Sequence, residues 1–242
     1  MTVIVISFIV PAYNEEFYLA GTLNALHAAG RASNQAYEII VADDASTDRT
    51  AEIALQNNAV LVSVAHRQIA ATRNAGAKAA RGDWFIFVDA DTLVNESVVL
   101  AAMHAMRHGA VGGGSGMRFD EPSPIYARFL LRLVVRLFRA TGLAAGCFLF
   151  CTRNAFDAVG GFDEDYFGAE ELVMSRELKR LGNFLILKET VTTSARKLRT
   201  YSLKEVLSLT SGILRHGTKA VKQREGMEFW YAERRKDPHD LP

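Results

Sequence analysis

The sequence predicts an α/β fold in which a mostly parallel sheet is flanked by helices. Strand-like and helix-like segments alternate four times over residues 3–110 with short connections, as in parallel sheets built from crossover units. The strand-like segments are largely continuous apolar runs, which is typical of strands that are buried on both faces. Three of them end in acidic residues, and the carboxyl ends of parallel strands meet at the edge where such sheets bind ligands.

The first strand is predicted from Val3 to Val10, where β-branched residues dominate. It ends in Pro11-Ala12-Tyr13-Asn14-Glu15-Glu16. There we expect Asn14 to cap a helix, and the two Glu residues suit the positive end of the helix dipole. Leucines then recur at helical spacing, at Leu19, Leu23 and Leu26.

The next strands follow the same plan. A strand at Glu38–Ala42 ends in Asp43-Asp44-Ala45-Ser46-Thr47-Asp48, a turn rich in residues that start helices. A third strand is predicted at Ala59–Val64, and an alanine-rich helix at Ile69–Ala80 must pack closely against its neighbours. The fourth strand is Trp84–Val88.

The motif Asp89-Ala90-Asp91 follows the fourth strand directly. Two carboxylates this close at a sheet edge repel each other and are costly to desolvate. A divalent cation held between them and a diphosphate would relieve both problems, and Mg²⁺ or Mn²⁺ suits such oxygen ligands. Asp is also common in turns at strand ends, so the pair alone leaves a metal site and a plain turn open.

The second half of the chain begins with a predicted helix at Asn95–His108. The glycine-rich run at 112–116 lacks the lysine of a phosphate-binding loop, so we interpret it as a strand that lets another backbone approach closely. Cys147 and Cys151 flank an apolar strand-like run and are predicted to be two buried thiols, because four residues of strand separate them too far for an easy disulfide.

Arginines recur on one face of a predicted helix at 125–140, at Arg128, Arg132, Arg136 and Arg139. An amphipathic surface helix with extended arginines accounts for the pattern. An interfacial helix that faces anionic lipid or a phosphorylated acceptor accounts for it equally. The sequence leaves both open.

Glu170-Glu171 opens a further helix that ends at Gly182. Two late strands are predicted at Phe184–Leu187 and Val191–Thr193, and Arg196-Lys197 follows them. The net charge is +1, which argues against nucleic acid, but residues 196–242 carry 11 basic and 6 acidic residues and so suggest an anionic partner there. We expect a cytoplasmic protein without a membrane span, with peripheral contact at the inner face of the membrane left open.

Five motifs in this order resemble the family 2 glycosyltransferases, which are inverting enzymes with the GT-A fold, over roughly residues 3–200. They are Val10-Pro11-Ala12-Tyr13-Asn14-Glu15, Val41 to Asp48, Arg73-Asn74-Ala75-Gly76, Asp89-Ala90-Asp91, and Gly161-Phe162-Asp163 followed by Glu170-Glu171. The resemblance implies a Rossmann-like GT-A domain over 1–200, with a nucleotide-binding half at about 1–110 and an acceptor half at about 111–200. A basic helical extension would occupy 201–242.

The resemblance also implies roles for particular residues. Those expected to hold the nucleotide and its diphosphate are Pro11, Ala12, Tyr13, Glu15, Asp43, Asp44, Arg73, Asp89, Arg196 and Lys197. Asp91, with Asp89, would bind a divalent cation, Mn²⁺ or Mg²⁺. Arg196-Lys197 stands where many GT-A enzymes place a metal-ligating histidine, so these cations would neutralise the diphosphate directly and lessen the dependence on metal.

Glu170-Glu171 matches the acidic pair that ends in the catalytic base of such enzymes, where Glu-Asp is the commoner pair. Glu171 is the expected base and Glu170 its partner, with the reverse assignment left open. The implied reaction is metal-assisted single displacement from a nucleotide sugar, with a UDP-sugar as the default donor, to the hydroxyl of a lipid-linked, glycan or small-molecule acceptor. The alternatives are a sugar nucleotidyltransferase, whose glycine-rich signature after the first strand is missing here, and a non-catalytic nucleotide-sugar-binding module.

Overall fold

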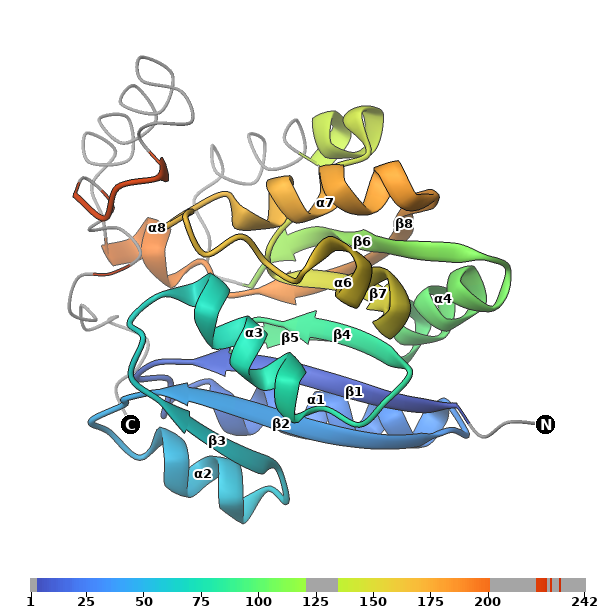
Figure 1. The fold of residues 1–242 in the computed structure, drawn as a ribbon. Helices are drawn as coiled ribbons and strands as arrows, with labels where there is room; N and C mark the ends of the chain where they lie inside the picture. Colours follow the sequence, from blue (N-terminus) through green and yellow to red (C-terminus); the bar gives the residue numbers. More distant parts are fainter. Residues whose placement is uncertain (1–3, 121–134, 201–220, 226, 228–230, 232–242) are drawn as a thin grey trace.

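The computed structural model describes residues 4–120, 135–200, 221–225, 227 and 231, without the side chains of residues 197 and 198. One sheet has the strand order β3-β2-β1-β4-β7-β6-β8-β5 (Figure 1). Its strands are β1 (Val5–Ala12), β2 (Ala36–Asp44), β3 (Val60–Val64), β4 (Trp84–Val88), β5 (Thr92–Leu93), β6 (Ala110–Phe119), β7 (Phe148–Thr152) and β8 (Asn183–Thr193). The helices are α1 (Leu19–Ala32), α2 (Thr50–Gln56), α3 (Ile69–Ala79), α4 (Glu96–Arg107), α6 (Arg153–Val159), α7 (Glu170–Leu181) and α8 (Arg196–Thr200).

The N-terminal half is the predicted parallel sheet. Strand β1 pairs in parallel with β2 and β4, and β2 pairs in parallel with β3. All five residues of β4 are buried, as a strand covered on both faces requires. The acidic ends of β1, β2 and β4 therefore lie at one edge of the sheet, which confirms the fold class and the convergence expected from the sequence.

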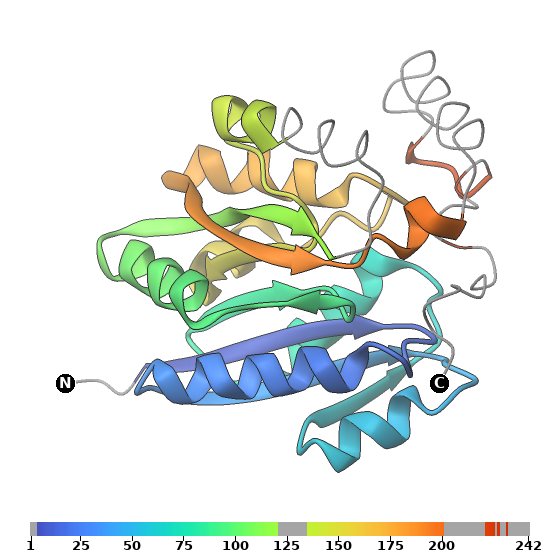
Figure 2. The ribbon, with the colours of Figure 1, turned by 180° about the vertical axis from the view of Figure 1, so that it is seen from behind.

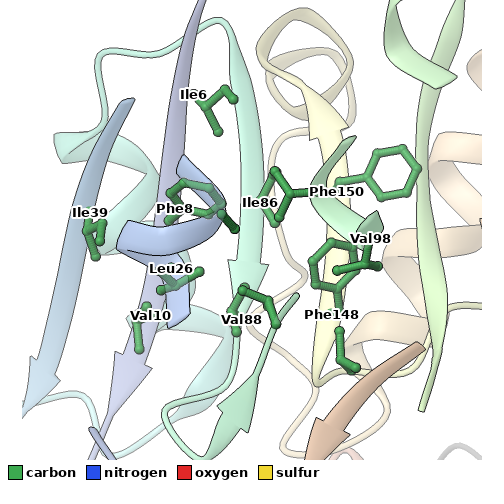
Figure 3. Packing of buried hydrophobic residues seen from close by; sticks show 14 of the residues in the cluster. Ile6, Phe8, Val10, Leu26, Ile39, Ile86, Val88, Val98, Phe148 and Phe150 are labelled. Carbon is green, nitrogen blue, oxygen red and sulfur yellow. The ribbon is translucent and has the colours of Figure 1, made fainter. Parts of the chain in front are cut away.

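Helices cover both faces of the sheet. In Figure 1 α3, α6 and α7 lie in front of it, and the reverse view of Figure 2 brings α1 and α4 forward. Alternate residues of each strand therefore face different helices: Phe8 and Ile86 belong to the core under α1 and α4, while Ile9 and Phe87 belong to the core under α3 and α6. Figure 3 shows the first of these clusters, where Leu26 of α1 packs over Phe8 and Val10.

Glycine and alanine bring α3 close to the sheet. A Cβ atom on Gly76 would lie 2.6 Å from Cγ2 of Ile9, so only glycine fits at this contact. The same holds for the glycine-rich run in β6, where a Cβ on Gly114 would lie 2.5 Å from that of Ala144. These contacts confirm the interpretation of both segments as sites of close backbone approach.

The second half of the sheet is mixed. Strand β7 runs antiparallel to β4 and to β6, whereas β6 and β8 are parallel with two register shifts. The prediction of two late strands was wrong, because β8 continues from Asn183 to Thr193. The two cysteines on either side of the Phe148–Phe150 run are buried free thiols, as predicted.

Asn14 does not cap α1, which begins at Leu19 with Tyr18 at its N-cap position. The φ angle of Asn14 is 51°, which turns the chain sharply. The Oδ1 of Asn14 accepts a hydrogen bond from the Thr47 backbone N–H at 2.8 Å. The residue therefore joins the loops that follow β1 and β2 instead of starting a helix, because the positive φ, which asparagine tolerates, directs its side chain to the neighbouring loop.

Several predictions on basic segments fall outside the described residues. Arg128, Arg132 and most of the extension at 201–242 are among them. Arg139 lies in a helical segment at 135–141, and its guanidinium donates to the carbonyl of Lys188 at 2.9 Å. No helix in the described ranges is long and apolar enough to cross a membrane.

Candidate active site

A cavity of about 450 Å³ lies at the carboxyl edge of β1, β2 and β4, opposite the N-termini of α7 and α8. Residues predicted from the sequence contribute much of its lining: Pro11, Ala12, Tyr13, Glu15, Asp44, Arg73, Asp89, Asp91, Glu170, Glu171 and Arg196. Asp43 is buried beside it, and Lys197 lies in α8 with its side chain outside the described residues. Strand ends and helix N-termini thus place carboxylates and guanidinium groups around one space.

One end of the cavity combines an aromatic ring with buried carboxylates. The guanidinium of Arg67 stacks on the ring of Tyr13, 3.4 Å from its centroid. Asp44 fixes this arrangement, because its carboxylate accepts the backbone N–H groups of Arg67 at 2.8 Å and Gln68 at 3.1 Å. Asp44 therefore shapes the loop before α3 and is itself committed to the backbone.

Asp43 lies next to Ala12 in the β1–β2 register and is 6% exposed. Its Oδ1 is buried without a hydrogen-bond partner among the described residues. A buried acceptor left in this state carries a desolvation cost that a ligand N–H would relieve. This end of the cavity is suited to a planar, hydrogen-bonding group.

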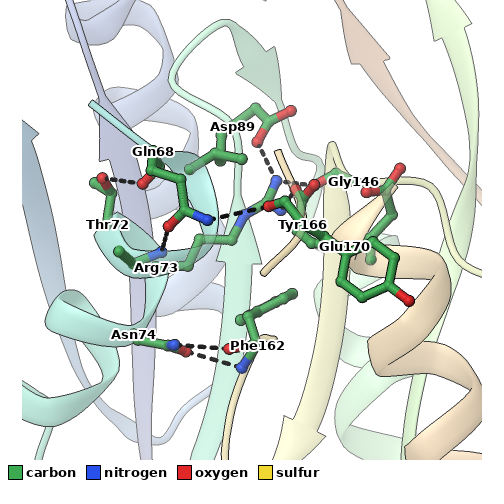
Figure 4. A network of polar contacts seen from close by, with 12 residues as sticks. Gln68, Thr72, Arg73, Asn74, Asp89, Gly146, Phe162, Tyr166 and Glu170 are labelled. Atoms are coloured by element: carbon green, nitrogen blue, oxygen red, sulfur yellow. Dashed lines mark hydrogen bonds and ion pairs between the residues drawn. The ribbon is translucent and has the colours of Figure 1, made fainter. Parts of the chain in front are cut away.

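Arg73 is the centre of a buried ionic network that crosses the cavity wall (Figure 4). One of its terminal nitrogens bonds the Glu170 carboxylate, and the other donates to Asp89 at 2.9 Å and to the Gly146 carbonyl at 3.1 Å. Burial opposes its charge, but the carboxylates of Asp89, Glu170 and Glu171 outweigh that effect and raise the pKa of Arg73. Arg73 thereby ties α3 to the end of β4 and the start of α7.

The two neighbouring glutamates differ in their surroundings. Glu170 is 4% exposed and paired with Arg73. Within the described part of the chain no cation pairs with Glu171, which faces the cavity. Burial, followed by the charge of Glu170, raises the pKa of Glu171 to about 8. Glu171 is therefore the carboxyl group that can exchange a proton near neutral pH.

Arg196 joins two acidic residues on the strand-end side of the cavity. Its guanidinium lies 2.5 Å from Glu15 and 3.1 Å from Asp91, and it covers the ring of Tyr18 at 4.8 Å. Its Nε is buried without a hydrogen-bond partner among the described residues. The structure thus brings the first residue of α8 to the two acids that end β1 and follow β4.

Charge remains unbalanced in the cavity. Among the described residues, six carboxyl groups line it against three arginines, Arg67, Arg73 and Arg196. The carboxyl groups are those of Glu15, Asp44, Asp89, Asp91, Glu170 and Glu171. The excess is three negative charges, or two when Glu171 is protonated. In the described ranges no group of three or more His, Cys, Asp or Glu side chains is arranged to hold a metal ion. A Mg²⁺ or Mn²⁺ ion nevertheless fits, because such ions often use one or two carboxylates and take their other ligands from phosphates and water.

The remaining lining was not predicted from the sequence. Much of it is apolar and comes from β6, the helical segment at 135–141, the residue before β7, and the loop before α7: Met117, Phe119, Phe138, Cys147 and Phe167. Tyr231, near the end of the chain, also lines the cavity. These residues carry no local motif, and only the fold brings them to the acidic strand ends.

The loop at 161–169, which leads into Glu170, is fastened to α3. The Asn74 side chain donates to the carbonyl of Phe162 at 2.9 Å and accepts that residue's N–H at 2.9 Å (Figure 4). The Gln68 amide donates to the carbonyls of Glu164 and Tyr166 at 2.6 and 3.1 Å. The helix that carries Arg73 therefore also positions the approach to both glutamates.

Comparison with known proteins gives a consistent result. Residues 7–160 match the sequence model of the family Glycosyl transferase family 2. The chain is 35% identical over 164 residues to the undecaprenyl-phosphate 4-deoxy-4-formamido-L-arabinose transferase of Pseudomonas paraeruginosa, covering 62% of this chain and 47% of that protein. The chain thus spans about half the length of this relative.

Solved structures share the fold. A mannosyltransferase from Pyrobaculum calidifontis in complex with GDP-Man and Mn²⁺ superposes with a TM-score of 0.66 and 18% identity over 97% of this chain and 66% of that one. TarS residues 1–349 from Staphylococcus aureus in complex with UDP superposes with a TM-score of 0.59 and 19% identity. The match covers 93% of this chain and 70% of that one. At these identities the likeness shows the fold alone.

Proposed function

Because the chain belongs to glycosyl transferase family 2, we propose that it moves a sugar from a nucleotide-diphosphate sugar to an acceptor hydroxyl, with inversion at the anomeric carbon. The observation that carries the proposal is the placement of Glu171 in one cavity with the acidic ends of three strands. A proton acceptor thereby lies beside a site whose charge suits a metal-bound diphosphate.

The nucleotide would bind at the end of the cavity formed by β1 and β2. Tyr13 and the Arg67 guanidinium offer a flat surface for a base, and Asp43 offers its buried Oδ1 to a ring N–H. Uracil and guanine both have such a ring N–H, whereas adenine and cytosine do not, which supports UDP or GDP as the nucleotide. Pro11, Ala12 and Glu15 would line the ribose.

Glu171 is the group we propose as the general base. Its carboxylate would take the proton of the acceptor hydroxyl as that oxygen attacks the anomeric carbon. The new C–O bond forms as the bond from that carbon to the diphosphate oxygen breaks, and the electron pair leaves on the diphosphate. One displacement from the opposite face inverts the centre. Glu170 is a poorer candidate because Arg73 already holds it.

Two groups would stabilise the leaving diphosphate. Asp89 and Asp91 would hold the divalent cation, which supplies positive charge to the departing oxygens when bound. Arg196, beside Asp91, adds a fixed guanidinium of the protein itself. We propose that the Arg196 guanidinium lessens the dependence of turnover on metal.

The acceptor would enter over the apolar wall formed by Met117, Phe119 and Phe138. This wall suits an acceptor that carries hydrocarbon, and the relative from P. paraeruginosa is named for an undecaprenyl-phosphate substrate. We propose a lipid-bearing acceptor, reached by peripheral contact with a membrane surface. A purely binding function is less well supported, because it gives no use to a carboxyl group with a pKa near 8.

The test is release of nucleoside diphosphate from a panel of UDP- and GDP-sugars, with and without Mn²⁺. We expect slow donor hydrolysis with one nucleotide, lost in Asp91→Ala and retained in Asp157→Ala, an exposed aspartate of α6. Folded wild-type protein that neither binds nor hydrolyses any of these donors in the presence of Mn²⁺ would overturn the proposal.

A further inference from the structure

Among the described C-terminal residues, Val221, Met227 and Tyr231 pack against the loop that leads into the two glutamates. The Phe167 N–H donates to the carbonyl of Val221 at 2.7 Å, and Val221 is 5% exposed. Met227 is 1% exposed and covers Gly168 so closely that a Cβ there would collide with its methyl group. These residues therefore hold the loop from outside, while Gln68 and Asn74 hold it from α3.

Tyr231 also reaches the cavity. Its ring meets Phe167 edge-on, with the centroids 5.9 Å apart, and the guanidinium of Arg224 lies 5.5 Å from its centroid. Its hydroxyl is 3.5 Å from the backbone N of Ile69, the first residue of α3. Among the described residues nothing accepts the proton of this hydroxyl, so the O–H donor remains available to a ligand.

Tyr231 lies between the start of α3 and the loop before α7, on the side of the cavity that carries Arg73 and Glu170. Its hydroxyl lies one helical turn before Arg73, and Glu170 and Arg73 both act electrostatically on it. A group bound between Tyr231 and the Arg73–Asp89 pair would be the part of the donor next to the reacting carbon.

We propose that Tyr231 is a specificity-determining residue that donates a hydrogen bond to a hydroxyl of the donor sugar, so that its side chain completes the sugar subsite. The inference rests on the proposed function. It assigns a role to a residue that lies beyond the stretch matched by the family model, which ends at residue 160.

Calorimetric titration with UDP, UDP-glucose, UDP-N-acetylglucosamine and GDP-mannose tests it. For the nucleotide sugar that binds wild type, Tyr231→Phe should weaken binding about 3- to 10-fold, the effect of one lost hydrogen bond, and leave binding of the bare nucleoside diphosphate within about twofold. Tyr37→Phe is the matched control, because the Tyr37 hydroxyl bonds the His27 ring of α1 and does not line the cavity. Its affinities should equal those of wild type.

Each other outcome is decisive. Equal losses for the diphosphate and the nucleotide sugar, or no loss for either, would overturn the role of Tyr231 while leaving the proposed function intact. A wild-type protein that binds none of the probes would overturn the proposed function itself. Thermal unfolding of Tyr231→Phe within about 2 °C of wild type would show that a selective loss does not come from a damaged fold.

Discussion

The two walls of the cavity are built on different principles. The β1, β2 and β4 wall consists of strand ends, where sheet pairing positions Asp44 within β2 and where Glu15 and Asp89 follow the paired residues of β1 and β4 closely. The facing wall consists of a loop, the first turn of α7 and the C-terminal residues that contact that loop, and it is held by side chains such as Asn74 and Met227. Backbone pairing sets the first wall and side-chain contacts set the second.

The difference between the walls indicates which part of the substrates each of them binds. A rigid strand-end wall suits a ligand that never changes, and we assign the nucleotide to it. A wall that is fastened by individual side chains can vary without disturbing the sheet, which suits recognition of a particular sugar and acceptor. Perturbing each wall separately should therefore give different kinetic signatures.

The largest effect is expected from Glu171→Gln in the α7 wall. Loss of a general base lowers turnover about 10²- to 10⁴-fold, while nucleotide affinity stays within about twofold. In wild type, turnover should rise as the pH passes through about 8, because the base must be ionised and the pKa of Glu171 is about 8. Rate–pH profiles under saturating donor measure this.

The same variant should be more stable than wild type. Between about pH 4.5 and 8 the unfolded chain releases the Glu171 proton and the folded protein keeps it, so the free energy of unfolding falls as the pH rises through that window. Glu171→Gln removes this loss, so its free energy of unfolding at pH 7 should exceed that of wild type by roughly 1–3 kcal/mol. Glu170→Gln should instead destabilise, since Arg73 loses a buried partner. The opposite ranking of the two variants would contradict the assignment of the base.

A smaller effect is expected from Arg196→Gln, which acts on the strand-end wall. Without the guanidinium, Asp91 and Glu15 attract a dication more strongly, so Mn²⁺ should bind roughly tenfold more tightly and metal-free turnover should fall. Electron paramagnetic resonance of free Mn²⁺ measures the affinity without any donor.

Arg118→Gln serves as the control for that measurement. Arg118 is an exposed residue of β6 that bonds Thr192 and does not line the cavity, so its loss should leave Mn²⁺ affinity unchanged. Unchanged affinity in Arg196→Gln as well would show that the guanidinium and the metal do not share Asp91.

The sequence predicted the strand-end wall far better than the other. Apolar runs that end in acids define β1, β2 and β4, and backbone geometry then forces those acids to one edge. It predicted the strand β7 but not its antiparallel direction, and it missed the length of β8, because strand pairing depends on partners distant in the chain. Phe138 lies in the predicted arginine-bearing helix and Tyr231 in the basic extension, and neither pattern marks them as cavity residues. The prediction that Asn14 caps a helix was wrong, because asparagine is common both at helix caps and in turns with positive φ.

The smallest effect is expected from Asn74→Ala, which loosens the α7 wall without touching its charges. The change leaves the N–H and C=O of Phe162 without their side-chain partner and costs about 1–3 kcal/mol of unfolding free energy. Because the loop at 161–169 leads into Glu171, turnover should fall about 3- to 10-fold, with nucleotide affinity unchanged.

Asn57→Ala separates this effect from a general loss of stability. Asn57 ends α2, and its side chain donates to the Ile53 carbonyl at 2.8 Å, far from the cavity lining. It should lower the melting temperature and leave turnover at the wild-type rate. If Asn57→Ala slowed turnover as much as Asn74→Ala, or if Asn74→Ala weakened nucleotide binding, the two walls would not act independently, and the division between a fixed nucleotide wall and an adjustable substrate wall would fail.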